Sequence, residues 1–197
     1  MGQLFEKFSS KENLKKAYNY VQNELAHSSL SVNPINHPAT TAINDLGEHF
    51  FTALEKYLRD ENYKPERGFF VYMPKDNLGL RPVCVLSMID RIVYQAMFNQ
   101  NIFGYKIDGQ LSDKVCFANR VNDDEKSEYF LSQYFNGWDD FCKEQKKAFD
   151  RGYSWKLELD VQQFYEHIPV ERLIEKLRND FDIKDEKILS ILKKQLC

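Results

Sequence analysis

The hydrophobic period of this chain changes at Gly68. Before this glycine, apolar residues recur at the spacing of one helix face over residues 10–26 and again over 39–59, which predicts two amphipathic helices. After it, the runs 69–73 and 80–86 are rich in aromatic and β-branched residues and flank a short polar stretch, which predicts a β-hairpin. The chain is therefore expected to combine helices with a small antiparallel sheet.

The rest of the chain shows both periods. Helical spacing returns in four segments, which are 87–102, 127–149, 170–181 and 184–196. Between the second and the third of these, apolar residues alternate with charged residues over 155–161, which predicts a strand with one apolar face. The predicted fold class is α+β, mostly helical, with a β-hairpin and a short sheet that contains this strand.

The composition limits the classes of protein that remain. Lys and Arg number 27 and Asp and Glu number 30, which gives a net charge of −3. This charge argues against a generally basic coat for nucleic acid but leaves room for a local basic groove. Because no apolar run is long enough to span a membrane and the first residues show no secretory signal, we expect a cytoplasmic protein. The four cysteines are too widely spaced for paired zinc ligands, and we expect reduced thiols.

The predicted hairpin carries a cation on each side of its turn, Lys75 and Arg81. This arrangement suits a polyphosphate, because lysine acts as a point charge and arginine as a bidentate donor. If the loop is 76–80, the two cations face each other on one side of the ribbon. If the loop is one residue shorter, Lys75 pairs with Leu80 and the cations lie on opposite faces. The alternative is a solvated hairpin whose charged edge prevents pairing with other strands.

Asp160 lies near the end of the predicted strand 155–161 and is followed by Phe164 and Tyr165. A carboxylate at the tip of a sheet is a suitable ligand for Mg²⁺, which prefers oxygen atoms and is commonly bound by one or two carboxylates together with substrate phosphates. The alternative is an exposed aspartate that ends a strand and caps the following turn. The local pattern leaves both interpretations open.

Several short motifs follow one another along the chain. They are Tyr63-Lys64-Pro65, Pro74-Lys75, Gly79-Leu80-Arg81-Pro82, Asp90-Arg91-Ile92-Val93 with Gln95-Ala96, and Asp160-Val161 with Phe164-Tyr165. In their order and spacing they resemble the reverse transcriptase family, specifically its fingers and the first half of its palm, over residues 50–177. The resemblance implies a right-hand polymerase fold with an N-terminal helical region (1–62), the fingers (63–150) and a truncated start of the palm (151–197).

The resemblance also implies roles for single residues. Lys75 and Arg81 correspond to the fingers residues that grip the incoming deoxynucleoside triphosphate. Asp160 corresponds to the first catalytic aspartate, which binds two Mg²⁺ ions in the complete enzyme, and the carbonyl group of Val161 to an auxiliary metal ligand. Tyr165 lies where the family has its sugar gate, an aromatic ring that leaves no room for a 2′-hydroxyl group.

Arg91 and Gln95 are weaker candidates for contacts with the template. For Asp90 and Arg91 we prefer a structural pair that holds a fingers helix, and an RNA-template contact from Arg91 is the alternative. Tyr94 separates Gln95 from the Asp-Arg-Ile-Val motif, whereas the glutamine follows that motif directly in many intron-type members. This departure resembles the bacterial branch that acts in antiphage defence and abortive infection.

The family's Tyr/Phe-x-Asp-Asp motif, its primer grip and its thumb have no counterpart in the sequence. Asp160 alone cannot hold two Mg²⁺ ions about 3.5 to 4 Å apart, and Glu158 projects from the same side of the strand without converging on the same ion. We therefore expect residues 1–197 to be inactive alone. The complete enzyme is expected to use an RNA template, a DNA primer and deoxynucleoside triphosphates, together with the missing palm and thumb.

Two other functions stay open at this point. A catalytically silent relative would keep the polymerase fold and bind nucleic acid or act as a scaffold, without the downstream aspartates. A metal-dependent nuclease would use Glu158 and Asp160 and needs a further ligand, for which His167 is the nearby candidate. The nuclease is the least favoured of the three, because a single histidine after a strand is more often a turn or interface residue than a metal ligand.

Overall fold

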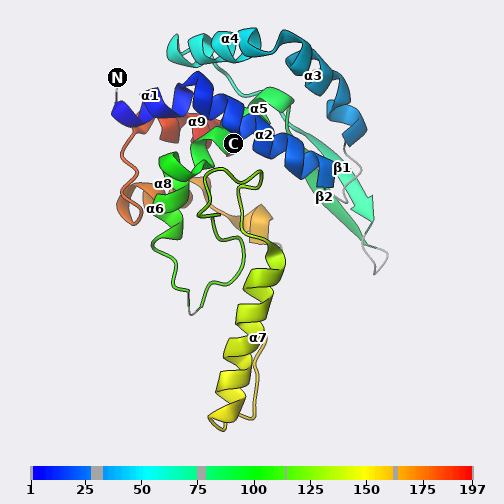
Figure 1. The fold of residues 1–197 in the computed structure, drawn as a ribbon, viewed down its shortest axis with the longest axis vertical. Coiled ribbons are helices and arrows are strands. Elements are labelled where there is room, and N and C mark those ends of the chain that lie inside the picture. Colours follow the sequence, from blue (N-terminus) through cyan, green and yellow to red (C-terminus); the bar gives the residue numbers. More distant parts are fainter. Residues whose placement is uncertain (1, 28–32, 75–78, 114, 162–163, 197) are drawn as a thin grey trace.

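The computed structural model describes residues 2–27, 33–74, 79–113, 115–161 and 164–196. The α-helices are α1 (Gln3–Ser9), α2 (Lys11–His27), α3 (Asn33–Leu46), α4 (Glu48–Arg59), α5 (Met88–Phe98), α6 (Tyr105–Asp108), α7 (Tyr134–Asp150), α8 (Val170–Asn179) and α9 (Glu186–Leu196). A π-helix, η1 (Gln100–Gly104), and a 3-10 helix, η2 (Phe164–His167), accompany them, and the strands are β1 (Phe69–Pro74) and β2 (Leu80–Val85). Figure 1 shows a helical body, a β-ribbon at its side and an arm formed by α7.

One hydrophobic core joins the helices of the body. α2 contributes Leu14, Tyr18 and Val21, which lie on one face because they are three or four residues apart. α5 contributes Ile92 and Met97 among others, and further core residues come from α1, α4, α8 and α9. The core therefore combines side chains from all three predicted regions, which are 1–62, 63–150 and 151–197.

Most of the predicted helices are confirmed with shifted ends. α2 matches the helix predicted over 10–26, and α8 and α9 match the last two. The helix predicted over 39–59 is divided into α3 and α4 at Gly47, whose φ of 53° lies in the left-handed region that favours glycine. η1 follows α5 almost directly, as a π-helix. The helix predicted over 127–149 begins only at Tyr134, as α7. The backbone of residues 130–132 pairs instead with residues 120–122, in the loop that follows α6.

The predicted hairpin is confirmed, but both predicted registers are wrong. β1 and β2 are antiparallel, with Pro74 opposite Leu80 and Met73 opposite Arg81. The connection is therefore 75–79, one residue earlier than the predicted loop 76–80. This register places the apolar positions 71, 83 and 85 together on one face of the ribbon, where Val85 is buried. A slip of one residue would turn these side chains to the other side, which excludes the predicted register in which position 75 pairs with Leu80.

The arm consists of α7 and the chain that runs back along it over residues 153–161 (Figure 1). The ammonium group of Lys156 lies 5.9 Å from the centroid of the Phe141 ring on α7. The strand predicted over 155–161 is wrong for the described chain, because this segment has no regular secondary structure and no strand pairs with it among the described residues. The side chains of Trp155 and Leu157 are 94% and 81% exposed. An alternating pattern specifies an apolar face, but a strand also requires a second strand to complete its hydrogen bonds.

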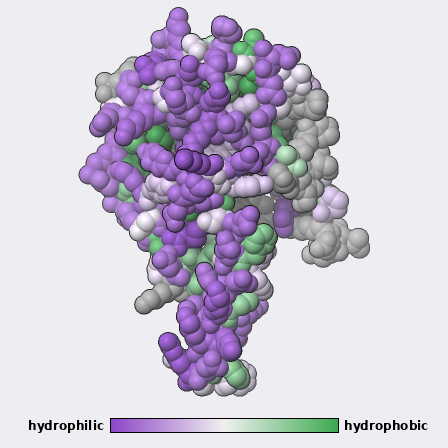
Figure 2. Space-filling view, viewed as in Figure 1, coloured by the Kyte–Doolittle hydropathy of each residue, from purple (hydrophilic) through white to green (hydrophobic). Residues whose placement is uncertain are grey.

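The fold is mixed α+β and mostly helical, as predicted, and the β-ribbon is the sheet found among the described residues. The short second sheet is not formed there. Figure 2 shows a largely hydrophilic face of the body, with apolar patches that continue along the arm. Within the described part of the chain, no helix is long and apolar enough to cross a membrane.

Candidate functional site

Asp90 is buried in the first turn of α5 and fixes the position of this helix. Its side chain accepts hydrogen bonds from the Tyr63 hydroxyl (2.5 Å), the Glu66 backbone N–H (3.0 Å) and the Ser87 hydroxyl (2.9 Å). Ser87 is also the N-cap of α5 and accepts a hydrogen bond from the backbone N–H of Asp90. The structural role predicted for Asp90 is therefore correct, but the predicted pairing with Arg91 is wrong. Adjacent residues on a helix do not face each other.

Arg91 and Gln95 lie one helical turn apart on the outer side of α5 and line the same cavity. The cavity has a volume of about 720 Å³. The other lining residues come from α2, from α5 and from the segment 129–131, and they are Tyr20, Val21, Asn23, Glu24, Tyr94, Phe98, Tyr129, Phe130 and Leu131. The structure thus brings together the two residues that were predicted to approach a template.

The cavity is rich in aromatic rings that contact one another in pairs. The ring centroids of Tyr94 and Phe98 are 4.9 Å apart, and those of Tyr20 and Phe130 are 5.8 Å apart. The Tyr20 hydroxyl also accepts a hydrogen bond of 2.9 Å from the side-chain amide of Gln100, and burial raises the pKa of Tyr94 above its ordinary value. Sequence reasoning missed these aromatic residues because they come from three distant segments. Only the spacing of Tyr94 and Phe98 on one helix gave a local signal.

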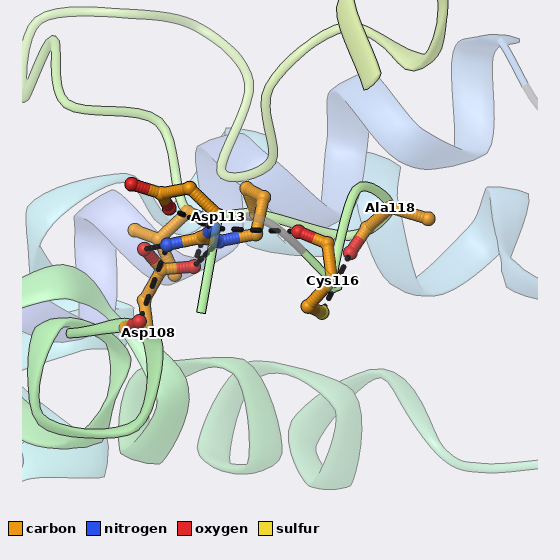
Figure 3. Close-up of polar contacts among 6 residues, drawn as sticks. Asp108, Asp113, Cys116 and Ala118 are labelled. Carbon is orange, nitrogen blue, oxygen red and sulfur yellow. Dashed lines mark hydrogen bonds and ion pairs between the residues drawn. The ribbon is translucent and has the colours of Figure 1, made fainter. Parts of the chain in front are cut away.

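A charged cluster holds the segment 129–131 against this cavity. Arg120 donates hydrogen bonds to both carboxylate oxygens of Asp108, at 2.8 and 2.9 Å, and pairs with Asp113 (Figure 3). The bond from Arg120 and another from the backbone of Val121 lower the pKa of Asp108. The backbone N–H of Ser132 donates to the carbonyl group of Arg120, and that of Asn122 donates to the carbonyl group of Phe130. Between these two bonds, Val121 and Leu131 form an isolated β-bridge. Arg120 is thus engaged in positioning the cavity wall.

Arg81 lies on the ribbon, opposite Met73. Its side chain is exposed and has no hydrogen bond or ion pair among the described residues. Lys75, the second predicted triphosphate ligand, lies outside the described residues. Among those that are described, Arg81 is therefore the available cation of the ribbon.

Asp160 and Val161 lie at the end of the exposed segment that follows α7. Both are exposed, and Val161 retains 63% of its accessible surface. Tyr165 belongs to the 3-10 helix η2, but its side chain lies outside the part that the structure describes. No described hydrogen bond or ion pair joins Asp160 to Arg81 or to the residues of the cavity, so the predicted site is not assembled by contacts among the described residues.

The described donor atoms around Asp160 are too few to hold two Mg²⁺ ions. Glu158 forms an ion pair with Lys156, whose hydrogen bond lowers the pKa of the Glu158 carboxyl group. Among the described residues, no group of three or more acidic, histidine or cysteine side chains could hold a metal ion. One carboxylate is too few for a site with two ions, which needs ligands from several elements. The predicted nuclease would need the same missing ligands.

Comparison of the sequence with models of known protein families and with curated proteins finds no match.

Proposed function

We propose that this chain forms the fingers and the start of the palm of an RNA-directed DNA polymerase, a reverse transcriptase. The observation that carries the proposal is the order of elements: a β-ribbon with Arg81 is followed by α5 with Arg91 and Gln95, and then by Asp160, four residues before the start of a short helix that contains Tyr165. This order supports the resemblance that the motifs indicate. A cytoplasmic location and a role in bacterial antiphage defence belong to the same proposal.

In this proposal the ribbon binds the triphosphate of the incoming deoxynucleotide. Arg81 is exposed and has no competing anion among the described residues, so its guanidinium group is available for a bidentate contact with phosphate oxygens. Lys75 is proposed as the second cation. Replacing Arg81 with alanine should weaken binding of deoxynucleoside triphosphates, whereas Arg67→Ala, an exposed arginine before the ribbon, should not.

The proposed role of Asp160 is to supply one carboxylate of the metal site. Because the described residues around it provide too few ligands, we propose that synthesis requires further carboxylates from outside residues 1–197. The chain of 197 residues is then expected to yield no extended primer on an RNA template with Mg²⁺ and deoxynucleotides. Robust extension by this chain alone would contradict that part of the proposal.

The decisive test is primer extension by the complete gene product, with Asp160→Ala compared with Asp150→Ala. Asp150 ends α7 and is exposed, so it controls for the loss of a carboxylate near the arm. We expect Asp160→Ala to abolish synthesis and Asp150→Ala to retain it, with both variants giving unchanged circular dichroism. Activity in Asp160→Ala would remove this residue from the metal site. A complete product that binds RNA but never extends a primer would instead favour the catalytically silent relative.

A further inference from the structure

The cavity beside α5 is large enough for a small ligand, and two of its lining residues, Arg91 and Gln95, are the predicted template contacts. Its volume of about 720 Å³ falls within the range of roughly 300 to 1,000 Å³ that is usual for small-molecule sites. Neither Arg81 nor Asp160 lines it. A ligand here would therefore lie apart from the proposed triphosphate and metal ligands but against the predicted template contacts, so the inference that follows deepens the proposed function.

The walls of the cavity favour a flat aromatic ligand. One aromatic pair, Tyr94 and Phe98, comes from α5, and the other joins Tyr20 of α2 to Phe130. Tyr94 is 36% exposed although most of its neighbours on α5 are buried, so part of its ring is open to a ligand. Aromatic rings are the usual stacking surface for unpaired bases, because every base has a π-face.

The polar groups at the cavity suit the edges of a base. The guanidinium group of Arg91 has no hydrogen bond or ion pair within the described chain, so its donors are available. The amide nitrogen of Gln95 donates to Asn99 at 3.1 Å, which orients the amide and leaves its carbonyl oxygen as an acceptor. Arginine and glutamine are the side chains that most often recognise the edges of guanine and adenine, and Glu24 adds an acceptor for exocyclic amino groups.

A cation lies next to Tyr20, one of the aromatic residues of the cavity. The ammonium group of Lys16 is 5.8 Å from the centroid of the Tyr20 ring. Lys16 lines an adjoining cavity that shares Tyr20 and Asn23 with the first one. The adjoining cavity is lined by three lysines and three glutamates. Because these charges balance, an anion is attracted only in the immediate vicinity of a lysine. Binding should therefore depend on stacking more than on salt.

We infer that this cavity binds a single unstacked nucleobase, with a preference for purines. The base belongs either to a free nucleotide or to single-stranded nucleic acid, and the recognition chemistry is the same for both. The inference concerns binding alone and does not require that the chain extend a primer.

The test uses 2-aminopurine, a fluorescent purine that is quenched when it stacks on an aromatic ring. Residues 1–197 are titrated into 2-aminopurine riboside monophosphate, and separately into a single-stranded oligonucleotide with one internal 2-aminopurine. Saturable quenching of both probes identifies a site for free nucleotides, and quenching of the oligonucleotide alone identifies a base held within a strand. Either result supports the inference. Absence of saturable quenching in both titrations overturns it.

Variants of the cavity locate the bound base. Tyr94→Ala should weaken binding about 5- to 150-fold, the range for loss of one stacked base, whereas Tyr94→Phe should retain it. Tyr57→Ala is the matched control, because Tyr57 is a helical tyrosine of similar exposure, 40%, outside the cavity. Arg91→Ala should reduce the preference for purines without changing the circular dichroism spectrum. Equal binding by the wild type, Tyr94→Ala and Tyr57→Ala would place the base elsewhere and overturn the inference.

Discussion

The hydroxyl group of Tyr63 donates a hydrogen bond of 2.5 Å to the carboxylate of Asp90, which joins the chain after α4 to the first turn of α5. The same hydroxyl accepts a hydrogen bond of 2.7 Å from the side chain of Gln195, in α9. Burial and the neighbouring Asp90 hold the pKa of Tyr63 far above its ordinary value. The phenol therefore remains a donor at all ordinary pH values, and three distant segments meet at one buried polar point.

Tyr63→Phe should lower the free energy of unfolding by about 1.5 to 3 kcal/mol, the usual contribution of a hydrogen bond to a charged group. The ring and its packing are kept, so the loss reports the hydroxyl group alone. Urea denaturation followed by circular dichroism measures it. Tyr57→Phe is the control, because Tyr57 is 40% exposed and should change by less than about 0.5 kcal/mol. Equal effects of the two variants would show that the bond to Asp90 contributes nothing.

Asp108→Asn should change how stability depends on pH. The pKa of Asp108 is lowered in the folded protein by Arg120, so this carboxylate stabilises the fold fully above its unfolded pKa of about 3.9 and loses that effect as the pH falls through its lower folded value. At pH 7 the variant should lose about 1 to 2 kcal/mol, since the bond is charge-assisted and bidentate but only partly buried. The loss should shrink steadily on acidification.

Thermal unfolding of both proteins between pH 7 and pH 2 tests this prediction. The other carboxylates are common to the two proteins, so the difference between their curves isolates Asp108. Asp113→Asn is the control, because its side chain is 87% exposed although it pairs with the same arginine. A difference between wild type and Asp108→Asn that stays constant over this range would show that the carboxylate does not titrate with folding.

The features that sequence could predict are those set by neighbouring residues. The hairpin follows from two β-rich runs on either side of a polar turn, and α2 from a single apolar face around Leu14 and Tyr18. The register of the hairpin was not predictable from the turn, because burial of the face with Val85 excludes a slip of one residue but not a slip of two. The break at Gly47 was missed because the apolar spacing continues across it.

The candidate sites show the same division. Arg91 and Gln95 could be placed on one helix face from their spacing, but the rings of Tyr20 and Phe130 reach the cavity only through tertiary packing. The role of Asp90 was predicted as structural, yet its partner Tyr63 is 27 residues away and gave no local signal. The catalytic role of Asp160 stays a prediction, because the metal site would also need ligands from other residues, which no local sequence pattern specifies.

Gly137→Ala should destabilise the attachment of the arm. A Cβ atom at this position would stand 2.0 Å from the backbone carbonyl oxygen of Phe117, which is too close for any rotamer change to relieve. Alanine gains about 0.5 to 1 kcal/mol of helix propensity over glycine, but displacing the backbone should outweigh this gain and give a net loss of about 1 to 3 kcal/mol. Denaturant unfolding measures the balance. Asn136→Ala, at the exposed neighbouring position, should be neutral or stabilising; a stabilised Gly137→Ala would show that the loop and α7 do not touch.

Leu157→Asn tests whether the alternating segment of the arm is unpaired, as the structure shows. The Leu157 side chain is 81% exposed, so its replacement should change the free energy of unfolding by no more than about 0.5 kcal/mol. Leu189→Ala in α9 is the comparison, since that side chain is 1% exposed and its truncation should destabilise by about 2 to 5 kcal/mol. Both are measured by urea denaturation of residues 1–197. A loss of more than about 2 kcal/mol in Leu157→Asn would exceed the effect of an ordinary surface substitution and would mean that the apolar face of 155–161 is covered in solution, which restores the strand that its alternation predicts.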